Sequence, residues 1–218
     1  MTERERPAER WLALPQPTSF TASGGLWAPQ RVRVIAGSTG LRREAERIEA
    51  ELRALGIVGA CTAVDPVLRL RLSPLARGRS DAGGLVPREM VPDGSASGVA
   101  VPGGSADVWA PEAVGVDESF RIDVADDIVV TVASEAGAFR ATRQILHNLR
   151  AQGGVPKGSV SSAPAVVERG LHLDAARTHY PAEWILQQLH AAADVGINVF
   201  QWHFSENEGF RLESAAFS

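Results

Sequence analysis

Residues 169–206 read RGLHLDAARTHYPAEWILQQLHAAADVGINVFQWHFSE, and this stretch decides the fold. Its two flanks, 166–174 and 197–204, are apolar at most positions, which is typical of strands buried on both faces of a parallel sheet. Between them, from Pro181 to Gly196, apolar residues recur at helical spacing, and a proline is tolerated in the first turn of a helix. The stretch therefore predicts a β-α-β unit.

Residues 1–165 show a different pattern, in which runs of period two alternate with amphipathic segments. Strands are predicted at 31–35, 67–72, 118–124 and 128–133, the last two as a hairpin, and helices at 41–55 and from Ser134, a capping residue, to Gly153. The residues from Pro156 to Pro164 are predicted to be a polar connector. This order indicates an α+β domain, an antiparallel or mixed sheet with helices on one face, that ends near Ala165.

The segment 73–117 interrupts this pattern, because it is rich in Gly, Ser, Pro and Asp and lacks periodicity. Within it, residues 76–106 are expected to form a long flexible loop, either disordered or acting as a lid. Asp117 and Glu118, which follow directly, are expected to be surface charges.

Composition excludes several classes of function. The 218 residues carry a formal net charge of −4 with scattered basic residues, so neither nucleic acid nor an anionic membrane is an expected partner. The single cysteine, Cys61, excludes an intramolecular disulfide. The N-terminal residues 1–17 lack the apolar run of a signal peptide or membrane anchor, so a cytoplasmic location is expected. The histidines lack metal-ligand spacing, and no metal or other cofactor is expected.

Two motifs in the β-α-β unit carry a family resemblance. The pattern R-G-x-x-L-D-x-x-R-x-x-x-P over 169–181, followed by N-x-x-x-W-H-x-x-acid over 198–206, resembles the start of the catalytic barrel of glycoside hydrolase family 20, the β-N-acetylhexosaminidases. Residues 118–122 and 136–141 resemble, more weakly, the end of the α+β domain that precedes that barrel. The resemblance implies that residues 166–218 supply the first β-α-β, two of eight strands, of a (β/α)₈ TIM barrel that is truncated here.

Functional groups of such a barrel collect at the C-terminal ends of its strands. Arg177 lies just past the first strand, where its guanidinium could donate several hydrogen bonds to sugar hydroxyls, and Glu206 follows the second strand. The resemblance implies that Arg177 grips the terminal sugar and that Glu206 shares its pocket. Many family members carry two aspartates where this chain has Glu206 and Asn207, so one charge is lost and Asn207 is assigned only a supporting role.

Three other residues near the motifs have two interpretations each, and a fourth has a structural interpretation alone. Asp174 either pairs with Arg177 or caps the loop after the strand. His203 is either a hydrogen-bonded core histidine or a catalytic or metal-binding group, and Trp202 either fills the barrel or forms a platform for a sugar ring. Arg169, which precedes the strand, is predicted to form a structural ion pair at the barrel floor.

The resemblance also implies a mechanism, in which the 2-acetamido group of the substrate attacks the anomeric carbon with retention, assisted by a consecutive Asp-Glu pair after the fourth strand. The substrate would be a terminal, β-linked N-acetylglucosamine or N-acetylgalactosamine. The only adjacent Asp-Glu here is Asp117-Glu118, in the first domain, so the pair is expected beyond Ser218 and these 218 residues are expected to be inactive alone.

Two other functions stay open, a non-catalytic carbohydrate-binding or interaction module and another glycosidase on the same barrel. The apolar strand faces and open edges of the β-α-β unit predict self-association of this chain.

Overall fold

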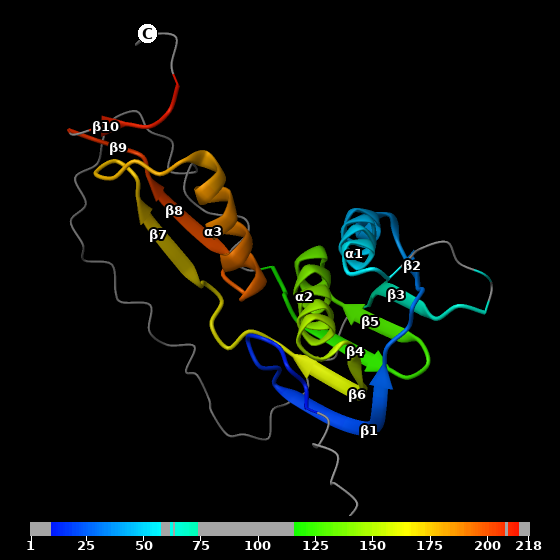
Figure 1. Cartoon of the computed structure of the whole chain (residues 1–218). Coiled ribbons are helices and arrows are strands. Elements are labelled where there is room, and N and C mark those ends of the chain that lie inside the picture. The colour runs from blue at the N-terminus through cyan, green and yellow to red at the C-terminus, as the bar shows by residue number, and fades with distance from the viewer. Residues whose placement is uncertain (1–9, 58–61, 63, 74–115, 208, 214–218) are drawn as a thin grey trace, which may run out of the picture.

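The structure is a computed structural model that describes residues 10–57, 62, 64–73, 116–207 and 209–213 (Figure 1). The loop predicted at 76–106 and Cys61 lie outside these residues. In the described part of the chain, no helix has both the length and the apolar character needed to cross a membrane.

A six-stranded mixed sheet forms the larger part of the molecule. Its strands are β1 (Ser19–Trp27), β2 (Arg33–Ala36), β3 (Val67–Leu72), β4 (Phe120–Val124), β5 (Ile128–Val132) and β6 (Val155–Ser162), in the order β1-β6-β4-β5-β3-β2. The pairs β2–β3 and β3–β5 are parallel and the other three are antiparallel, with β4 and β5 forming the predicted hairpin. The predicted α+β sheet is therefore present as a mixed sheet.

Two helices lie on the same side of this sheet, α1 (Arg42–Ala54), which follows the short 3₁₀ helix η1 (Thr39–Leu41), and α2 (Glu135–Gln152) (Figure 1). The hydroxyl of Ser134 accepts a hydrogen bond from the Gly137 amide at 3.1 Å, so the predicted N-cap of α2 is confirmed. Gly153, with φ of 72°, ends the helix in the left-handed region. Alternate strand residues such as Ile122 and Val130 are fully buried beneath the helices and form the core.

The prediction of a polar connector from Pro156 to Pro164 was wrong, because β6 occupies most of this segment and pairs with both β1 and β4. The other face of the sheet is not covered by the helices, so β6 carries serines there and its alternation is weak. At Gly158, φ is 143° and an added Cβ would lie 2.1 Å from the Thr21 carbonyl oxygen. The glycine that resembles a loop signal thus permits close approach of the β1 backbone.

The predicted β-α-β unit consists of β7 (Gly170–Asp174), α3 (Ala182–Asp194) and β8 (Val199–His203), with β7 and β8 parallel. A short hairpin of β9 (Ser205–Glu206) and β10 (Gly209–Phe210) follows it. The expectation that both strand faces are buried was wrong for the described residues. None of the residues of α3 is buried, and Leu171 on β7 is 37% exposed. A two-stranded sheet with one helix leaves these apolar groups uncovered.

Candidate functional site

The C-terminal ends of β7 and β8 bring the predicted site residues together. Asp174 and His203 are the last residue pair in the register of the two strands. Arg177 follows Asp174 by three positions and Glu206 follows His203 by three positions, so both side chains emerge at the same edge.

Arg177 and Glu206 form the central pair of this site. The Nε of Arg177 lies 3.1 Å from Oε1 and 3.0 Å from Oε2 of Glu206. These bonds, with the charges of Glu206 and Asp174, raise the pKa of Arg177. The side chain of Arg177 is 68% exposed and that of Glu206 only 15%, so the carboxylate is the fixed partner. No described residue bonds to the Nη groups of Arg177, which leaves these donors available to a ligand.

Asp174 fulfils both roles that the sequence left open. Its Oδ1 accepts hydrogen bonds from the backbone amides of Ala176 at 3.1 Å and Arg177 at 3.2 Å, and its Oδ2 lies 3.6 Å from the Arg177 Nε. The backbone bond from Arg177 is the main reason that the pKa of Asp174 is lowered. Asp174 therefore caps the turn and also faces the guanidinium.

His203 belongs to the same group but is not a core residue. Its side chain is 41% exposed, and its Nε2 lies 3.6 Å from Oε2 of Glu206. The prediction of a hydrogen-bonded core histidine was therefore wrong, because the chain turns away directly after β8 and leaves the ring at the strand end.

Trp202 and Asn207 occupy different positions from this group. Trp202 is half-buried and stacks at a tilt on Phe204, with ring centroids 5.7 Å apart, and Phe204 in turn contacts the edge of Phe210 at 5.7 Å. The Nε1 of Trp202 is buried without a hydrogen-bond partner among the described residues. Asn207 is exposed in the turn between β9 and β10. The packing favours the filling interpretation for Trp202, and the supporting role of Asn207 stays a prediction.

Arg211, five residues beyond the second motif, is a site-shaping residue that sequence reasoning did not select. Its Nε and Nη2 donate to the carbonyls of Ala175 and Ala176 at 2.8 and 2.9 Å. Both alanines are buried, and their amides donate to the His203 carbonyl at 2.9 and 3.1 Å. The turn that presents Arg177 is thus fixed from both sides.

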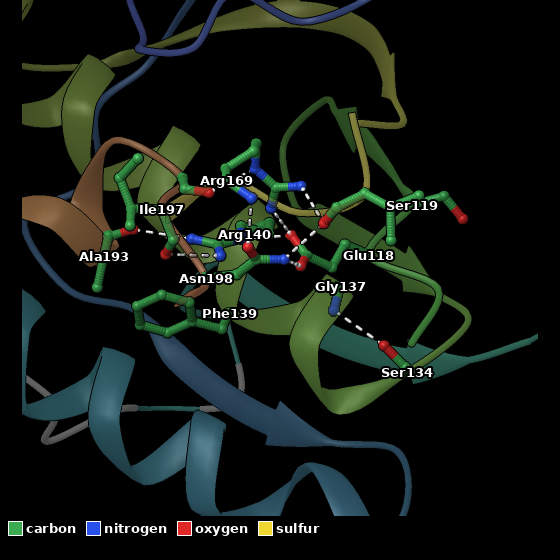
Figure 2. A network of polar contacts seen from close by, with 12 residues as sticks. Glu118, Ser119, Ser134, Gly137, Phe139, Arg140, Arg169, Ala193, Ile197 and Asn198 are labelled. Carbon is green, nitrogen blue, oxygen red and sulfur yellow. Dashed lines mark hydrogen bonds and ion pairs between the residues drawn. The ribbon is translucent and has the colours of Figure 1, made fainter. Parts of the chain in front are cut away.

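A second polar cluster surrounds Glu118, beside the N-terminal ends of β7 and β8 (Figure 2). The expectation that Glu118 is a surface charge was wrong, because this residue is only 7% exposed. Its carboxylate accepts hydrogen bonds from Arg140 Nε at 2.7 Å, from Asn198 Nδ2 at 2.9 Å and from Arg169 Nη2. Burial alone would raise the pKa of Glu118, but the bonds from Arg140 and Asn198 and the charges of the two arginines lower it.

Arg169 forms the structural ion pair predicted for it, with Glu118 as the partner. Its guanidinium also donates to the carbonyls of Gly196 and Val166, both at 2.6 Å. Arg140 reaches the same region from α2 and donates to the carbonyls of Ala193 at 2.9 Å and Ile197 at 3.1 Å. Two arginines therefore join the six-stranded sheet and its helices to the turn between α3 and β8.

In the described residues, no group of three or more His, Cys, Asp or Glu side chains has an arrangement that could hold a metal ion. The polar groups that converge at the site are a guanidinium, which donates hydrogen bonds, two carboxylates, which accept them, and an imidazole, a set suited to polar, hydroxyl-bearing ligands.

Comparisons with known proteins agree with these features. Residues 168–218 match the profile described as "Glycosyl hydrolase family 20, catalytic domain". The chain is 30% identical over 115 residues to a beta-hexosaminidase of Vibrio furnissii, which covers 50% of this chain and 19% of that protein. It is 33% identical over 90 residues to the N,N'-diacetylchitobiase of Vibrio harveyi, or 40% of this chain and 10% of that protein.

A solved structure shows the same fold. The GH20 exo beta-N-acetylglucosaminidase of Vibrio harveyi, solved in complex with N-acetylglucosamine, aligns with a TM-score of 0.65 at 16% identity, over 94% of this chain and 27% of that one. The chain thus corresponds to a fifth or less of the length of these two curated relatives. With the two motifs, the shared fold and these relatives in agreement, the chain is related to the family 20 glycosyl hydrolases.

Proposed function

We propose that this chain supplies part of the sugar-binding site of a β-N-acetylhexosaminidase, an exo-acting glycoside hydrolase that releases terminal β-linked N-acetylglucosamine or N-acetylgalactosamine. The observation that carries the proposal is the pair of hydrogen bonds between Arg177 and Glu206 across the ends of two neighbouring parallel strands. Such strand ends carry the functional groups of (β/α)₈ barrels.

The chemistry of this pair suits a neutral saccharide. Among the described residues, Glu206 bonds only to the Nε of Arg177, and the four hydrogens on the Nη groups have no partner there, so they can bond to hydroxyl oxygens. A planar guanidinium held by a less exposed carboxylate is pre-organised, which lowers the entropic cost of binding. The relative solved with bound N-acetylglucosamine supports a sugar of that class as the ligand.

Under this proposal, residues 1–165 form an α+β domain that precedes the catalytic barrel, and residues 166–218 form the first β-α-β of that barrel. The parallel pairing of β7 with β8 supports this division. The uncovered apolar groups of the unit, such as Leu171 and Trp184, would meet further barrel elements or a second copy of the chain.

The proposed mechanism is retaining and substrate-assisted, with the 2-acetamido group as the nucleophile. The one adjacent Asp-Glu pair in these 218 residues is Asp117-Glu118, and Glu118 is buried against two arginines. Its partners Arg169 and Asn198 directly precede β7 and β8. Because each strand has five residues, these starts lie about 16 Å from the strand ends that carry the proposed sugar site. Glu118 is therefore unsuited to act as the acid, and these 218 residues alone are proposed to bind sugar without cleaving it.

The test is a titration of the 218-residue chain with N-acetylglucosamine, followed by NMR, beside an assay with a chromogenic N-acetylglucosaminide. We expect weak binding that is lost in Arg177→Ala and no hydrolysis at enzyme-like rates. The matched control is Arg121→Ala, because Arg121 is also an exposed arginine that is bonded to a carboxylate, that of Asp123 on the sheet.

Two outcomes would contradict the proposal. Hydrolysis at enzyme-like rates would show that the acid groups are present in this chain. Binding that survives Arg177→Ala would place the sugar elsewhere and would favour a separate carbohydrate-binding module.

A further inference from the structure

The Glu118 cluster connects the two strands whose far ends carry the proposed sugar site. Glu118 lies just before β4, Arg140 is on α2, Arg169 directly precedes β7 and Asn198 directly precedes β8. We infer that Glu118 is a positioning residue, which fixes the starts of β7 and β8 relative to each other and thereby sets the distance between Arg177 and Glu206 at their ends. Its consequence for sugar binding rests on the proposed function.

One carboxylate, that of Glu118, holds the starts of both strands. Arg169 and Asn198 donate to the Oε2 and Oε1 atoms of Glu118, respectively. Asn198 also accepts from the Arg169 amide at 2.9 Å through Oδ1 and donates to the Val167 carbonyl at 2.8 Å. The backbone adds bonds from the amides of Asn198 and Val199 to the Arg169 carbonyl at 3.0 and 3.2 Å. The relative position of the strands is therefore defined where they begin.

The register of β7 and β8 transmits this relative position along both strands. The register runs without interruption from Gly170 opposite Val199 to Asp174 opposite His203. A shift by one residue would displace a strand end by about 3.3 Å. The bonds between Arg177 and Glu206, at 3.0 and 3.1 Å, do not tolerate such a shift.

The contacts between the six-stranded sheet with its helices and the β-α-β unit are largely polar. None of the α3 residues is buried. The C-terminal end of α3 instead receives Arg140 on its carbonyls, and Asp194 lies 3.3 Å from Arg143 and 3.6 Å from Arg150. Because little apolar packing fixes the position of the β-α-β unit, the buried Glu118 carboxylate, which is only 7% exposed, has a larger influence on that position.

Loss of the Glu118 charge would leave Arg140 and Arg169 without their shared partner. The side chains of Arg140 and Arg169 are only 13% and 21% exposed, so without the carboxylate two largely buried cations would face each other. Removing one partner of a buried pair is costly for this reason. The cations would separate, and the strand starts would move with Arg169.

The experiment compares Glu118→Gln with Glu44→Gln in the 218-residue chain. Glu44 is the matched control, because it is equally buried, at 6%, and bonds to Thr142 on α2, but it has no recorded bond to β7, α3 or β8. Amide hydrogen exchange is measured along β7 and β8, and the side-chain Nε–H resonance of Arg177 is followed by NMR. A residue that only stabilised the sheet unit would leave that resonance unchanged.

We expect Glu118→Gln to speed exchange in β7 and β8 by about tenfold or more and to shift the Arg177 resonance, since charged hydrogen bonds are lost. Exchange at Ile122 and Val130, in the sheet core, should stay slow, and Glu44→Gln should leave the Arg177 resonance in place. Unchanged β7–β8 exchange and an unchanged Arg177 resonance in Glu118→Gln would overturn the inference.

A second variant covers the case in which Glu118→Gln unfolds the whole chain, seen as fast exchange at Ile122 and Val130. Arg169→Lys keeps the charge beside Glu118 but removes the forked donors. It is expected to move the Arg177 resonance in the same way, and an unmoved resonance would again overturn the inference.

The sugar titration separates the two proposals. If the wild-type chain does not bind N-acetylglucosamine but Glu118→Gln moves the Arg177 resonance, the positioning role stands and the proposed function fails. If the wild-type chain binds the sugar and Glu118→Gln alters neither resonance nor affinity, the positioning role alone is refuted.

Discussion

The Nε of Arg177 is bonded to both carboxylate oxygens of Glu206, at 3.1 and 3.0 Å, across the ends of two parallel strands. The carboxylate is the less exposed member, so it orients the guanidinium. His203 Nε2, 3.6 Å from Glu206 Oε2, and Asp174 Oδ2, 3.6 Å from Arg177 Nε, complete the group. The first prediction concerns what happens when this orienting charge is removed.

Glu206→Gln should weaken binding of N-acetylglucosamine while the thermal unfolding temperature stays nearly the same. An ion pair in which one partner, here Arg177, is largely exposed contributes little to stability, whereas loss of a charge-assisted bond that orients a ligand-binding guanidinium should cost about tenfold in affinity. The measurement is an NMR titration beside a thermal melt. The control is Glu183→Gln, on the exposed first turn of α3, where neither quantity should change. A full-affinity Glu206→Gln chain would show that Glu206 does not orient Arg177 for binding.

The second prediction concerns pH, because the two buried glutamates differ in the sign of their effect. The pKa of Glu118 lies below its ordinary value of 4.5, so its contribution to stability is present above pH 4.5 and is lost as the pH falls through the folded-state pKa. The pKa of Glu44 is raised above 4.5, mainly by burial, so its contribution to stability is full below pH 4.5 and is lost as the pH rises through the folded-state pKa.

Urea unfolding between pH 3 and pH 7 checks both signs, with each variant compared with the wild-type chain. The stability lost in Glu118→Gln should shrink as the pH falls. Glu44→Gln should gain stability relative to wild type as the pH rises, because a neutral amide carries no desolvated charge. If the difference in unfolding free energy from wild type changed in the same direction with pH for both variants, the opposite signs assigned to Glu118 and Glu44 would be contradicted.

The sequence predicted those elements whose signals are local. The helix after Ser134 has a capping side chain, an apolar stripe and a glycine stop, and all three are present. The β-α-β unit was also predictable, because its apolar runs and helical spacing lie within about forty residues. Arg177 and Glu206 were found together for the same reason, since each follows a recognisable strand.

The features that were missed depend on partners far away in the chain. Glu118 follows a polar segment and resembles a surface charge, but its partners lie 22, 51 and 80 residues further on. In β6 the residues that face away from the helices are polar, and Gly158 reads as a loop signal unless the backbone of β1 is known to lie against it. Arg211 binds carbonyl groups, and no sequence pattern marks a carbonyl that needs a donor.

The third prediction tests this explanation of Gly158. In Gly158→Ala, the new Cβ would meet the Thr21 carbonyl oxygen at 2.1 Å, at a φ of 143°. Gly56→Ala is the matched control, because Gly56 also has a positive φ, 80°, but nothing lies within 4 Å of an added Cβ. We expect about 1 kcal/mol of destabilisation for the control and clearly more for Gly158→Ala, measured by urea unfolding. Equal losses would mean that the close approach of β1 is unimportant.

The fourth prediction separates the two interpretations of Trp202. Its Nε1 is buried with no hydrogen-bond partner in the described part of the chain, while its ring packs on Phe204 at 5.7 Å. An unsatisfied buried donor costs about 1–3 kcal/mol. In Trp202→Phe, removal of this donor should offset the packing that the smaller ring loses, so the free energy of unfolding should change by less than about 1 kcal/mol.

Trp11→Phe is the control for this experiment. Trp11 is 4% exposed, and its Nε1 donates to Gln144 Oε1 at 2.9 Å, so the same substitution leaves a buried acceptor unpaired and should cost about 1–3 kcal/mol. Urea unfolding followed by circular dichroism measures both variants without relying on tryptophan fluorescence. If Trp202 only fills space, Trp202→Phe should also keep its affinity for N-acetylglucosamine. A variant that stays stable but loses that affinity would instead identify Trp202 as a platform for the sugar ring.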